Sequence, residues 1–458
     1  MITHRTSRVR LLAATMAAAA VFALTAGCAP GTDTTPAKTT ASAGKIQTDA
    51  SKLGDVTLTV WDQLVRGGQN GEIEALNKAF QEKYPNITIK RNAQSTDDLA
   101  KTLRLAISGS DAPDVAVVNN GRNQMGAFAK ANLIVSLEPY AEAYGWRDRF
   151  SKSVLAISSY SADGTTFGSG NLYGMPQMGE VVGVYYNKEK LAALGLEVPK
   201  TWSEFTSQLK TIKSKGETPL ILGNLEKWSA FHVFGPIQGA HTPAEEIQNL
   251  ALGNLGGDWT DANNTAAATE LSDWVKAGYF NEDVNGSKYD DMIAKFGKGT
   301  GVFLPAGSWV AAVLDPVMGD NLGFFVPPPV NEGDAPSTTG GSSMPFSITS
   351  ASKNPDAAAA YINFITSDDA MKVIAKNGEL PVLHSAELAP ASGGVKDAYV
   401  AYELVATKGN LLPYLDYATP TFNETLGAAL QDLIGGAQTP EQFTQTLQAD
   451  YGAFVGKK

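Results

Sequence analysis

The stretch DVTLTVWDQL (residues 55–64) opens the part of the chain whose pattern decides the fold. Val56, Leu58 and Val60 alternate with polar residues, which predicts a half-buried β-strand. Beyond it, apolar residues at helical spacing (73–80), a strand near 87–89, a helix over 99–107 and a strand at 115–118 follow in turn. Alternation of this kind builds a largely parallel sheet with helices on its faces, so we expect an α/β fold.

A second α/β region is expected after Tyr173. Residues 181–186 predict a strand, and Thr201 with Glu204 has the sequence of a capping box at the start of a helix. Further helices are expected from about Pro355 and from Pro440. From Gly54 onward the chain has about 405 residues, which exceeds one comfortable hydrophobic core and indicates two domains.

The N-terminus has the pattern of a lipoprotein signal peptide. A basic start precedes an apolar run over residues 11–24, which would form roughly 21 Å of helix. A bilayer core needs about 30 Å, so the run is typical of a signal peptide and not of a membrane span. Cys28, the only cysteine, follows Ala26 and Gly27. This end resembles the lipobox of bacterial lipoproteins, apart from Thr25, where leucine is commoner. An ordinary signal peptide beside an unrelated cysteine is the alternative.

Residues 1–27 are therefore the expected signal peptide, and residues 28–53 the expected lipidated N-terminus and flexible tether. The tether is rich in threonine, alanine, proline and serine, which bury too little apolar surface to offset the entropy of ordering. The net charge of −11 becomes about −14 once the three positive charges of residues 1–27 are removed. Such acidity argues against nucleic-acid binding and against electrostatic binding to anionic lipid through a polybasic segment.

Enzyme motifs are weak in this chain. The four histidines are scattered and form no zinc-binding pair, and His232 and His241 are expected to be separate surface or core residues. The segment 297–304 matches neither a dinucleotide loop nor a P-loop, and no serine has the glycine pattern of a nucleophile elbow. Glycosidase carboxylates can be distant in sequence, so a sugar hydrolase stays open. No metal, cofactor or catalytic residue is predicted.

Eight segments in order resemble one family. They are 58–62 (LTVWD), 80–87 (FQEKYPNI), 112–115 (APDV), 173–176 (YGMP), 184–188 (VYYNK), 199–205 (PKTWSEF), 307–309 (GSW) and 353–358 (KNPDAA). Their order and spacing resemble the family 1 extracellular solute-binding proteins, the maltose-binding-protein-like receptors of bacterial ABC importers. The resemblance covers nearly all of the chain after the tether.

The resemblance implies a two-lobe periplasmic-binding-protein-like fold, with a ligand cleft between the lobes and a multi-strand hinge. By analogy the N-lobe is expected at 54–180 plus 327–380, and the C-lobe at 181–326 plus 381–458. It also implies a monomeric receptor that delivers a carbohydrate, expected to be an oligosaccharide, to permease subunits with a cytoplasmic ATPase. The receptor would lie on the outer face of the cell membrane, held there by its lipid anchor alone.

Candidate ligand-binding residues come from strand ends and from the matched motifs. In open α/β sheets ligands bind outside the carboxyl ends of strands, which indicates Trp61, Asp62, Gln63, Asn119 and Asn120. By resemblance, Trp309 stacks on a sugar ring and Glu180 accepts hydrogen bonds from sugar hydroxyls. A core tryptophan and a surface glutamate are the alternatives. The remaining candidates are weaker and comprise Trp228, Gly341, Ser342 and Asp416; Trp202 is assigned to packing. A non-sugar solute and a lipid-anchored sugar hydrolase stay open as alternative functions.

Overall fold

A computed structural model describes residues 46–456 of the chain, which all belong to one compact unit, residues 39–458. Its first sheet has the strand order β10-β3-β1-β2. The three strands predicted from residues 56–118 are parallel, and β10 pairs antiparallel with β3. The strands are β1 (Val56–Asp62), β2 (Ile87–Ala93), β3 (Val115–Val117) and β10 (Phe346–Ile348). The predicted strand–helix alternation is confirmed here.

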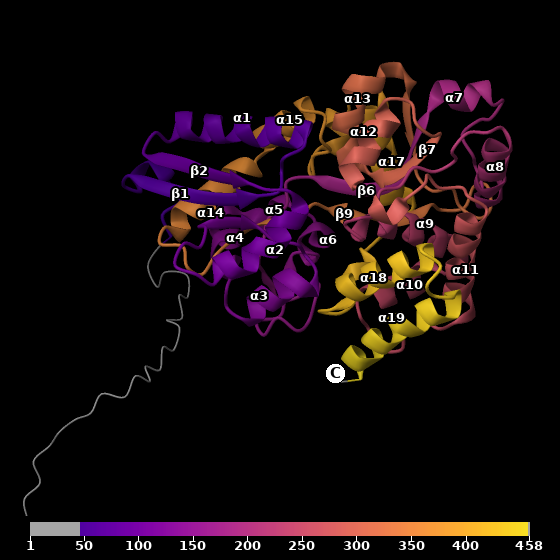
Figure 1. Cartoon of the computed structure of the whole chain (residues 1–458). Helices are drawn as coiled ribbons and strands as arrows, with labels where there is room; N and C mark the ends of the chain where they lie inside the picture. Colours follow the sequence, from indigo (N-terminus) through magenta and orange to yellow (C-terminus); the bar gives the residue numbers. More distant parts are fainter. Residues whose placement is uncertain (1–45, 457–458) are drawn as a thin grey trace, which may run out of the picture. The chain divides into compact units, whose positions relative to one another are not determined.

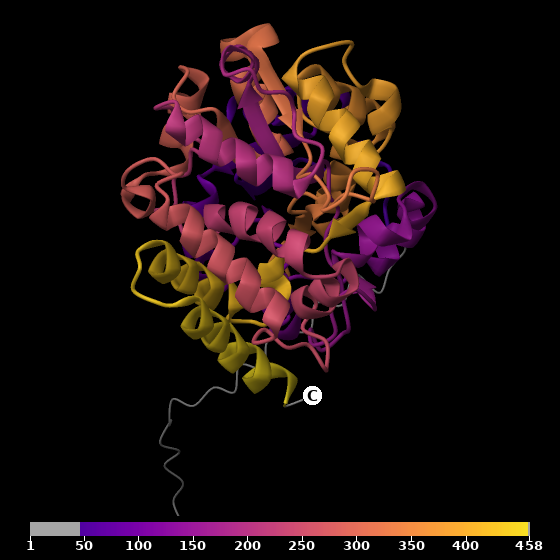
Figure 2. The ribbon, with the colours of Figure 1, turned by 90° about the vertical axis from the view of Figure 1, so that its right-hand side faces the viewer.

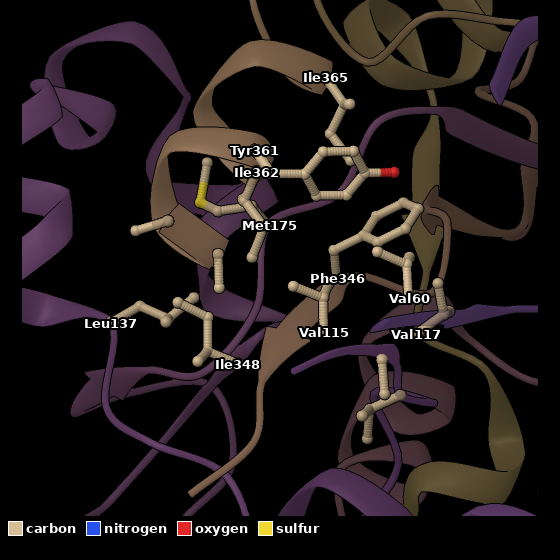
Figure 3. Close-up of a cluster of buried hydrophobic side chains, with 14 of the residues drawn as sticks. Val60, Val115, Val117, Leu137, Met175, Phe346, Ile348, Tyr361, Ile362 and Ile365 are labelled. Carbon is tan, nitrogen blue, oxygen red and sulfur yellow. The ribbon is translucent and has the colours of Figure 1, made fainter. Parts of the chain in front are cut away.

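Helices from distant parts of the chain cover this first sheet. Figure 1 shows the orange helix α14 among the indigo and purple elements of the chain's first third. The first-lobe helices are α1 (Gly67–Lys83), α2 (Thr96–Ile107), α3 (Ala127–Lys130), α4 (Glu138–Tyr144), α5 (Trp146–Arg149), α6 (Lys152–Ala156), α14 (Pro355–Ile365) and α15 (Asp368–Lys376). A two-stranded ribbon joins β4 (Ser159–Tyr160) to β5 (Asn171–Leu172). Figure 3 shows the core, where Phe346 and Ile348 of β10 meet Val115, Val117 and Tyr361.

The second lobe is built on a five-stranded sheet that includes the long strand β6 (Gly179–Asn187). β6 pairs antiparallel with β7 (Phe303–Gly307), β8 (Leu322–Phe325) and β9 (Ser337–Ser342), and β11 (Asn410–Leu412) lies parallel to β9. Side chains of β6 alternate between two cores, with Val181 and Tyr185 in one and Val184 in the other. A strand buried on both faces is continuously apolar, which explains the run at 181–186.

The second lobe's helices pack on both faces of its sheet. Among the helices within residues 46–456, none is both long and apolar enough to cross a bilayer. Figure 2 shows the yellow helices of the C-terminus beside the pink helices near residues 231–276. The helices are α7 (Lys188–Ala193), α8 (Trp202–Ser214), α9 (Phe231–His241), α10 (Ala244–Ala251), α11 (Ala262–Lys276), α12 (Tyr289–Gly297), α13 (Ala311–Met318), α16 (Ser385–Leu388), α17 (Gly394–Lys408), α18 (Phe422–Ile434) and α19 (Pro440–Val455).

Three segments cross side by side between the lobes. The backbone N–H of Gly179 donates to the carbonyl of Leu380 (2.9 Å), and Ser343 donates to the carbonyl of Met178 (2.9 Å). Val382 donates to Gln177 across the same junction (3.0 Å). The segments at 177–179, at 343 and at 380–382 are therefore hydrogen-bonded neighbours at this junction.

The middle crossing lies later than expected. The sequence placed it at 325–327 and assigned 327–342 to the first lobe. Instead, residues 337–342 form β9 and pair with β6 and β11 of the second lobe, so the chain crosses at 343–345. The three prolines at 327–329 belong to a loop of the second lobe, where the carbonyl of Pro329 accepts from the N–H of Trp202 (2.8 Å).

The expected tether also ends earlier than residue 53. Ala50 is fully buried in the first-lobe core, and Ile46 and Leu53 pack against that core. The side chain of Asn86 donates to the carbonyls of Ala50 (3.0 Å) and Leu53 (3.2 Å). These hydrogen bonds from a side-chain amide to backbone carbonyls hold a segment whose composition alone indicates disorder.

Candidate functional site

A cavity of about 210 Å³ is lined by residues of both lobes. The first lobe contributes residues that follow β1 and β3, at the carboxyl ends of parallel strands. The second lobe contributes Glu180 of β6, the 3-10 helices after β7 and β11, and the start of α9. Loops at strand ends are where an open α/β sheet binds its ligands.

Seven of the predicted ligand-binding residues line this cavity: Gln63, Asn119, Asn120, Glu180, Trp228, Trp309 and Asp416. They come from six places between residues 63 and 416, and only the tertiary fold brings them together. Their shared position gives the sequence prediction a structural basis. Their roles toward a ligand stay predictions.

Trp61 and Asp62, although they end β1, do not line the cavity. Asp62 is fully buried and accepts from Arg91 Nε (2.7 Å), Arg91 Nη2 (2.7 Å) and the N–H of Leu64 (2.9 Å). Its two carboxylate oxygens are therefore committed to an internal ion pair, and we withdraw Asp62 as a hydroxyl acceptor. Trp61 is half-buried and packs against the first-lobe core, because side chains on a strand alternate between faces.

Gly341 and Ser342 lie beside the cavity but do not line it. Gly341 is paired with Glu180 across β9 and β6, and its φ of +144° is a conformation that favours glycine. Its contribution is backbone geometry next to Glu180. Ser342 is buried, and its hydroxyl has no hydrogen-bond partner among residues 46–456.

Trp309 belongs to an aromatic wall in which each ring touches another. Its indole Nε1 donates to Tyr289 Oη (3.2 Å), and its ring lies 5.2 Å from that of His232. Trp228 lies 4.6 Å from Tyr289 and 5.5 Å from His232, measured between ring centroids. Trp309 and Trp228 are both half-buried, so part of each ring stays open to the cavity. Such faces can cover the apolar side of a pyranose ring.

Glycine before Trp309 has a steric reason. A Cβ atom on Gly307 would lie 2.0 Å from Cζ3 and 2.1 Å from Cη2 of Trp309. Gly307 has an ordinary extended backbone, with φ of −83°, so the conformation itself does not demand glycine. The tryptophan ring therefore lies over the end of β7 in space that any other residue at 307 would fill.

Two carboxylates of the cavity are held away from water. Glu180 Oε2 accepts from Tyr414 Oη (2.9 Å), and burial raises the pKa of Glu180 to about 7. Asp416 is 5% exposed, and burial raises its pKa to about 6. Asn423 Nδ2 lies 3.4 Å from Asp416 Oδ2, which leaves that carboxylate weakly paired. Both groups can accept hydrogen bonds from a ligand.

Side-chain amides supply further groups on the first-lobe side. Asn120 Nδ2 donates to the carbonyl of Ile157 (2.8 Å), which fixes the amide so that Oδ1 is the remaining acceptor. Asn119 Oδ1 accepts from the N–H of Gly121 (2.8 Å). Gln63 is 6% exposed, and its Oε1 has no partner among the described residues.

Sequence reasoning missed several lining residues. His232 is buried in the wall, and burial lowers its pKa to about 3, so the ring is neutral at neutral pH. Tyr414 and Tyr417 flank Asp416, and that proximity was an available signal. Arg66, Asp97 and Glu226 also line the cavity, but no pattern distinguishes them from surface charges.

Two other predictions lie elsewhere. Trp202 packs as expected: it is 8% exposed, its Nε1 donates to Glu270 Oε1 (3.0 Å), and its ring stacks near Trp274. Cys28 lies outside the described residues, so the predicted lipidation stays a prediction.

Comparison with known proteins gives a consistent assignment. Residues 67–372 match the family described as bacterial extracellular solute-binding protein, which is more than half of the chain. The chain is 24% identical over 345 residues to the multiple sugar-binding protein of Streptococcus mutans, covering 72% of this chain and 76% of that protein. It is 28% identical over 341 residues to the diacetylchitobiose binding protein DasA of Streptomyces coelicolor, covering 71% and 73%.

Solved structures have the same fold. A chitin oligosaccharide binding protein has a TM-score of 0.75 at 25% identity, covering 88% of this chain and 99% of that one. The protein RafE in complex with raffinose has a TM-score of 0.68 at 21% identity, covering 87% and 99%. The expected two-lobe α/β fold is therefore confirmed.

Proposed function

Since the chain belongs to the family of bacterial extracellular solute-binding proteins, we propose that it captures an oligosaccharide between its lobes and delivers it to the permease of an ABC importer. One observation carries the ligand class: two tryptophans, seven amide side chains and the carboxyl groups of Glu180 and Asp416 line a single cavity. Aromatic faces suit the apolar side of a sugar ring, and the polar groups suit its hydroxyls. The relatives named for sugars support the same class.

The mechanism we propose is binding without chemistry. Contacts from both lobes are complete only when the lobes are closed, so ligand shifts the population toward the closed form. The permease would recognise that form and, with its cytoplasmic ATPase, move the sugar inward. Glu180 would fix the orientation of a sugar ring as a hydrogen-bond acceptor, and Trp309 would provide its apolar platform.

A ligand panel tests the binding. Purified residues 46–458 would be titrated by calorimetry with maltotriose, raffinose, xylotriose, N,N′-diacetylchitobiose and its free-amine form, chitobiose. At 100 times its dissociation constant a ligand adds about 2.7 kcal/mol of stability, which a thermal-shift assay also detects. Trp309→Ala should weaken binding tenfold or more, since about 1.4 kcal/mol is a decade of affinity. Normal affinity in a badly destabilised variant would remove Trp309 from the site.

A hydrolase is the competing proposal, because Glu180 and Asp416 share one cavity and have raised pKa values. The bound oligosaccharide would be incubated with protein for a day and recovered by chromatography. A receptor returns it intact. Cleavage that disappears in Glu180→Gln would overturn the receptor function.

We also propose that Cys28 is lipidated and holds the protein at the outer face of the cell membrane. Each buried CH₂ contributes about 0.8 kcal/mol, so several acyl chains give firm anchoring. Cys28→Ser should therefore move the protein from the membrane fraction to the soluble one. A variant that stays in the membrane as fully as the parent would contradict the anchor.

A further inference from the structure

The lining of the cavity is strongly acidic. Four carboxylates contribute to it (Asp97, Glu180, Glu226 and Asp416), and Arg66 is the only cationic side chain among its lining residues. Arg66 Nε donates to Asp290 Oδ1 (2.9 Å), a carboxylate that does not line the cavity. Arg66 is therefore already paired, and the lining holds no unpaired cation to face its four carboxyl groups.

Buried polar atoms of the same cavity also lack partners, and most of them are acceptors. Asn120 Oδ1, Gln63 Oε1 and Gln69 Oε1 have no hydrogen-bond partner among the described residues, and their residues are 1%, 6% and 5% exposed. The amide of Asn120 is fixed by its bond to Ile157, so its unpartnered atom is an oxygen. A buried acceptor without a partner costs free energy, so the site suits a ligand rich in donors.

A neutral sugar can pair with the unpartnered acceptor oxygens of the cavity, but it cannot balance the charge of its carboxylates. Hydroxyl groups can satisfy the amide oxygens, but they leave Glu180 and Asp416 as buried carboxylates without a counter-charge when the lobes close. A protonated amine supplies both the donors and the charge. Trp228 and Trp309 of the aromatic wall would add to it, since aromatic faces attract cations.

We propose that the ligand is an oligosaccharide that carries a protonated amine, held between the Glu180 and Asp416 carboxylates and the aromatic wall. This inference rests on the proposed function, because it adds a charge to the saccharide class given above. It goes beyond that function by assigning the carboxylates to charge recognition and not to hydroxyl binding alone.

A matched pair of disaccharides tests the charge. Chitobiose with both amines free and N,N′-diacetylchitobiose differ only in acetylation, which removes the positive charge. Calorimetric titration of residues 46–458 at pH 6.5 should show at least tenfold tighter binding of the free-amine form. This preference should shrink as sodium chloride rises from 20 to 500 mM, because salt screens charges. Equal or tighter binding of the acetylated form would overturn the inference and leave the proposed function intact.

Two variants assign the preference to residues. In Glu180→Gln with Asp416→Asn the preference for the free amine, measured as the ratio of the two dissociation constants in the same variant, should fall below threefold. Asp111→Asn removes an exposed carboxylate outside the cavity and should leave the preference unchanged. An undiminished preference in the double variant would overturn the assignment.

Choline separates charge from sugar. It carries a permanent positive charge and no saccharide, so it should bind at least a hundredfold more weakly than chitobiose. Choline bound as tightly as chitobiose would overturn both the inference and the proposed function. Absence of binding by every saccharide of the panel would contradict the proposed function itself.

Discussion

Gly307 controls the position of Trp309, because the ring occupies the space of a Cβ atom at 307. Gly307→Ala keeps an allowed backbone conformation but forces the ring to move, and overpacking of this kind costs about 1–3 kcal/mol. We expect at least tenfold weaker binding of the panel's tightest saccharide, measured by calorimetry. Gly54→Ala, with no atom within 4 Å of the new Cβ, is the control. Unchanged affinity in Gly307→Ala would show that the ring position is irrelevant to binding.

Glu379, beside the crossing at Leu380, makes stability depend on pH. It is 2% exposed, and burial raises its pKa to about 8, with Arg66 opposing and Glu180 adding to the shift. Between about pH 4.5 and pH 8 the folded state therefore holds a proton that the unfolded state has lost. The free energy of unfolding should fall across this range as pH rises, by at most about 1.4 kcal/mol per pH unit from this group.

Glu379→Gln tests this dependence, because an amide has no proton to lose in this range. Urea midpoints at pH 5 and pH 8.5 should differ less in the variant than in the parent. Glu245→Gln, at an exposed position, should keep the parent's dependence. Equal pH slopes for the parent and Glu379→Gln would contradict the raised pKa.

At the scale of elements, the helix caps at Thr439 and Thr201 differ. Thr439 Oγ1 accepts from the N–H of Gln442 (3.3 Å), and Gln442 Oε1 accepts from the N–H of Thr439 (2.9 Å), which completes a capping box. At α8, Thr201 accepts from Glu204 N (3.2 Å), but the Glu204 carboxylate accepts from the N–H of Lys200 (2.7 Å). The expected reciprocal bond at Thr201 is therefore wrong, because the carboxylate binds one residue earlier.

Thr439→Ala should lower the free energy of unfolding by about 1 kcal/mol, since the first-turn N–H groups lose an acceptor. The denaturant midpoint measures this change. Gln445→Ala, at an exposed position in the same helix, should cost nothing because alanine favours helix. Faster amide exchange confined to the first turn of α19 would accompany the loss. A Thr439→Ala midpoint equal to the parent's would show that the cap does not stabilise α19.

On the scale of the whole molecule, Arg122 joins the two lobes. It is 5% exposed, and its Nη1 donates to the carbonyl of Thr165 in the first lobe (2.6 Å). Its Nη2 donates to the carbonyl of Leu252 in the second (2.9 Å). The guanidinium also lies 5.1 Å from the ring centroid of Phe454 in the second lobe. These contacts join the two lobes outside the cavity, because none of the residues that make them lines it.

Arg122→Ala removes these contacts and should favour the open form. Small-angle scattering of the sugar-free protein should give a larger radius of gyration than the parent's, and saturating sugar should reduce it. Arg147→Ala removes an ion pair with Glu138 inside the first lobe and should leave the radius unchanged. An unchanged radius in Arg122→Ala, with folding confirmed, would show that this contact does not bias the lobes.

Much of the fold follows from local sequence. The strands at 56–62, 87–93 and 115–117 and the helices between them were predictable because alternation and helical periodicity report which face of each element is buried. Strand ends then indicated Gln63, Asn119 and Asn120. The motif that contains Trp309 came from family resemblance, and its steric basis at Gly307 is visible only in the structure.

Long-range pairing decided the rest. The hydrogen bond between Tyr414 and Glu180 joins positions 234 residues apart, and no local pattern determines it. Asp62 ends a strand as Gln63 does, yet Arg91 on the neighbouring strand binds its carboxylate and removes it from the cavity. Local sequence determined the strands and helices between residues 56 and 118, since alternation and helical periodicity are local patterns. The tertiary structure decided which strand ends meet, because that depends on pairing between distant segments.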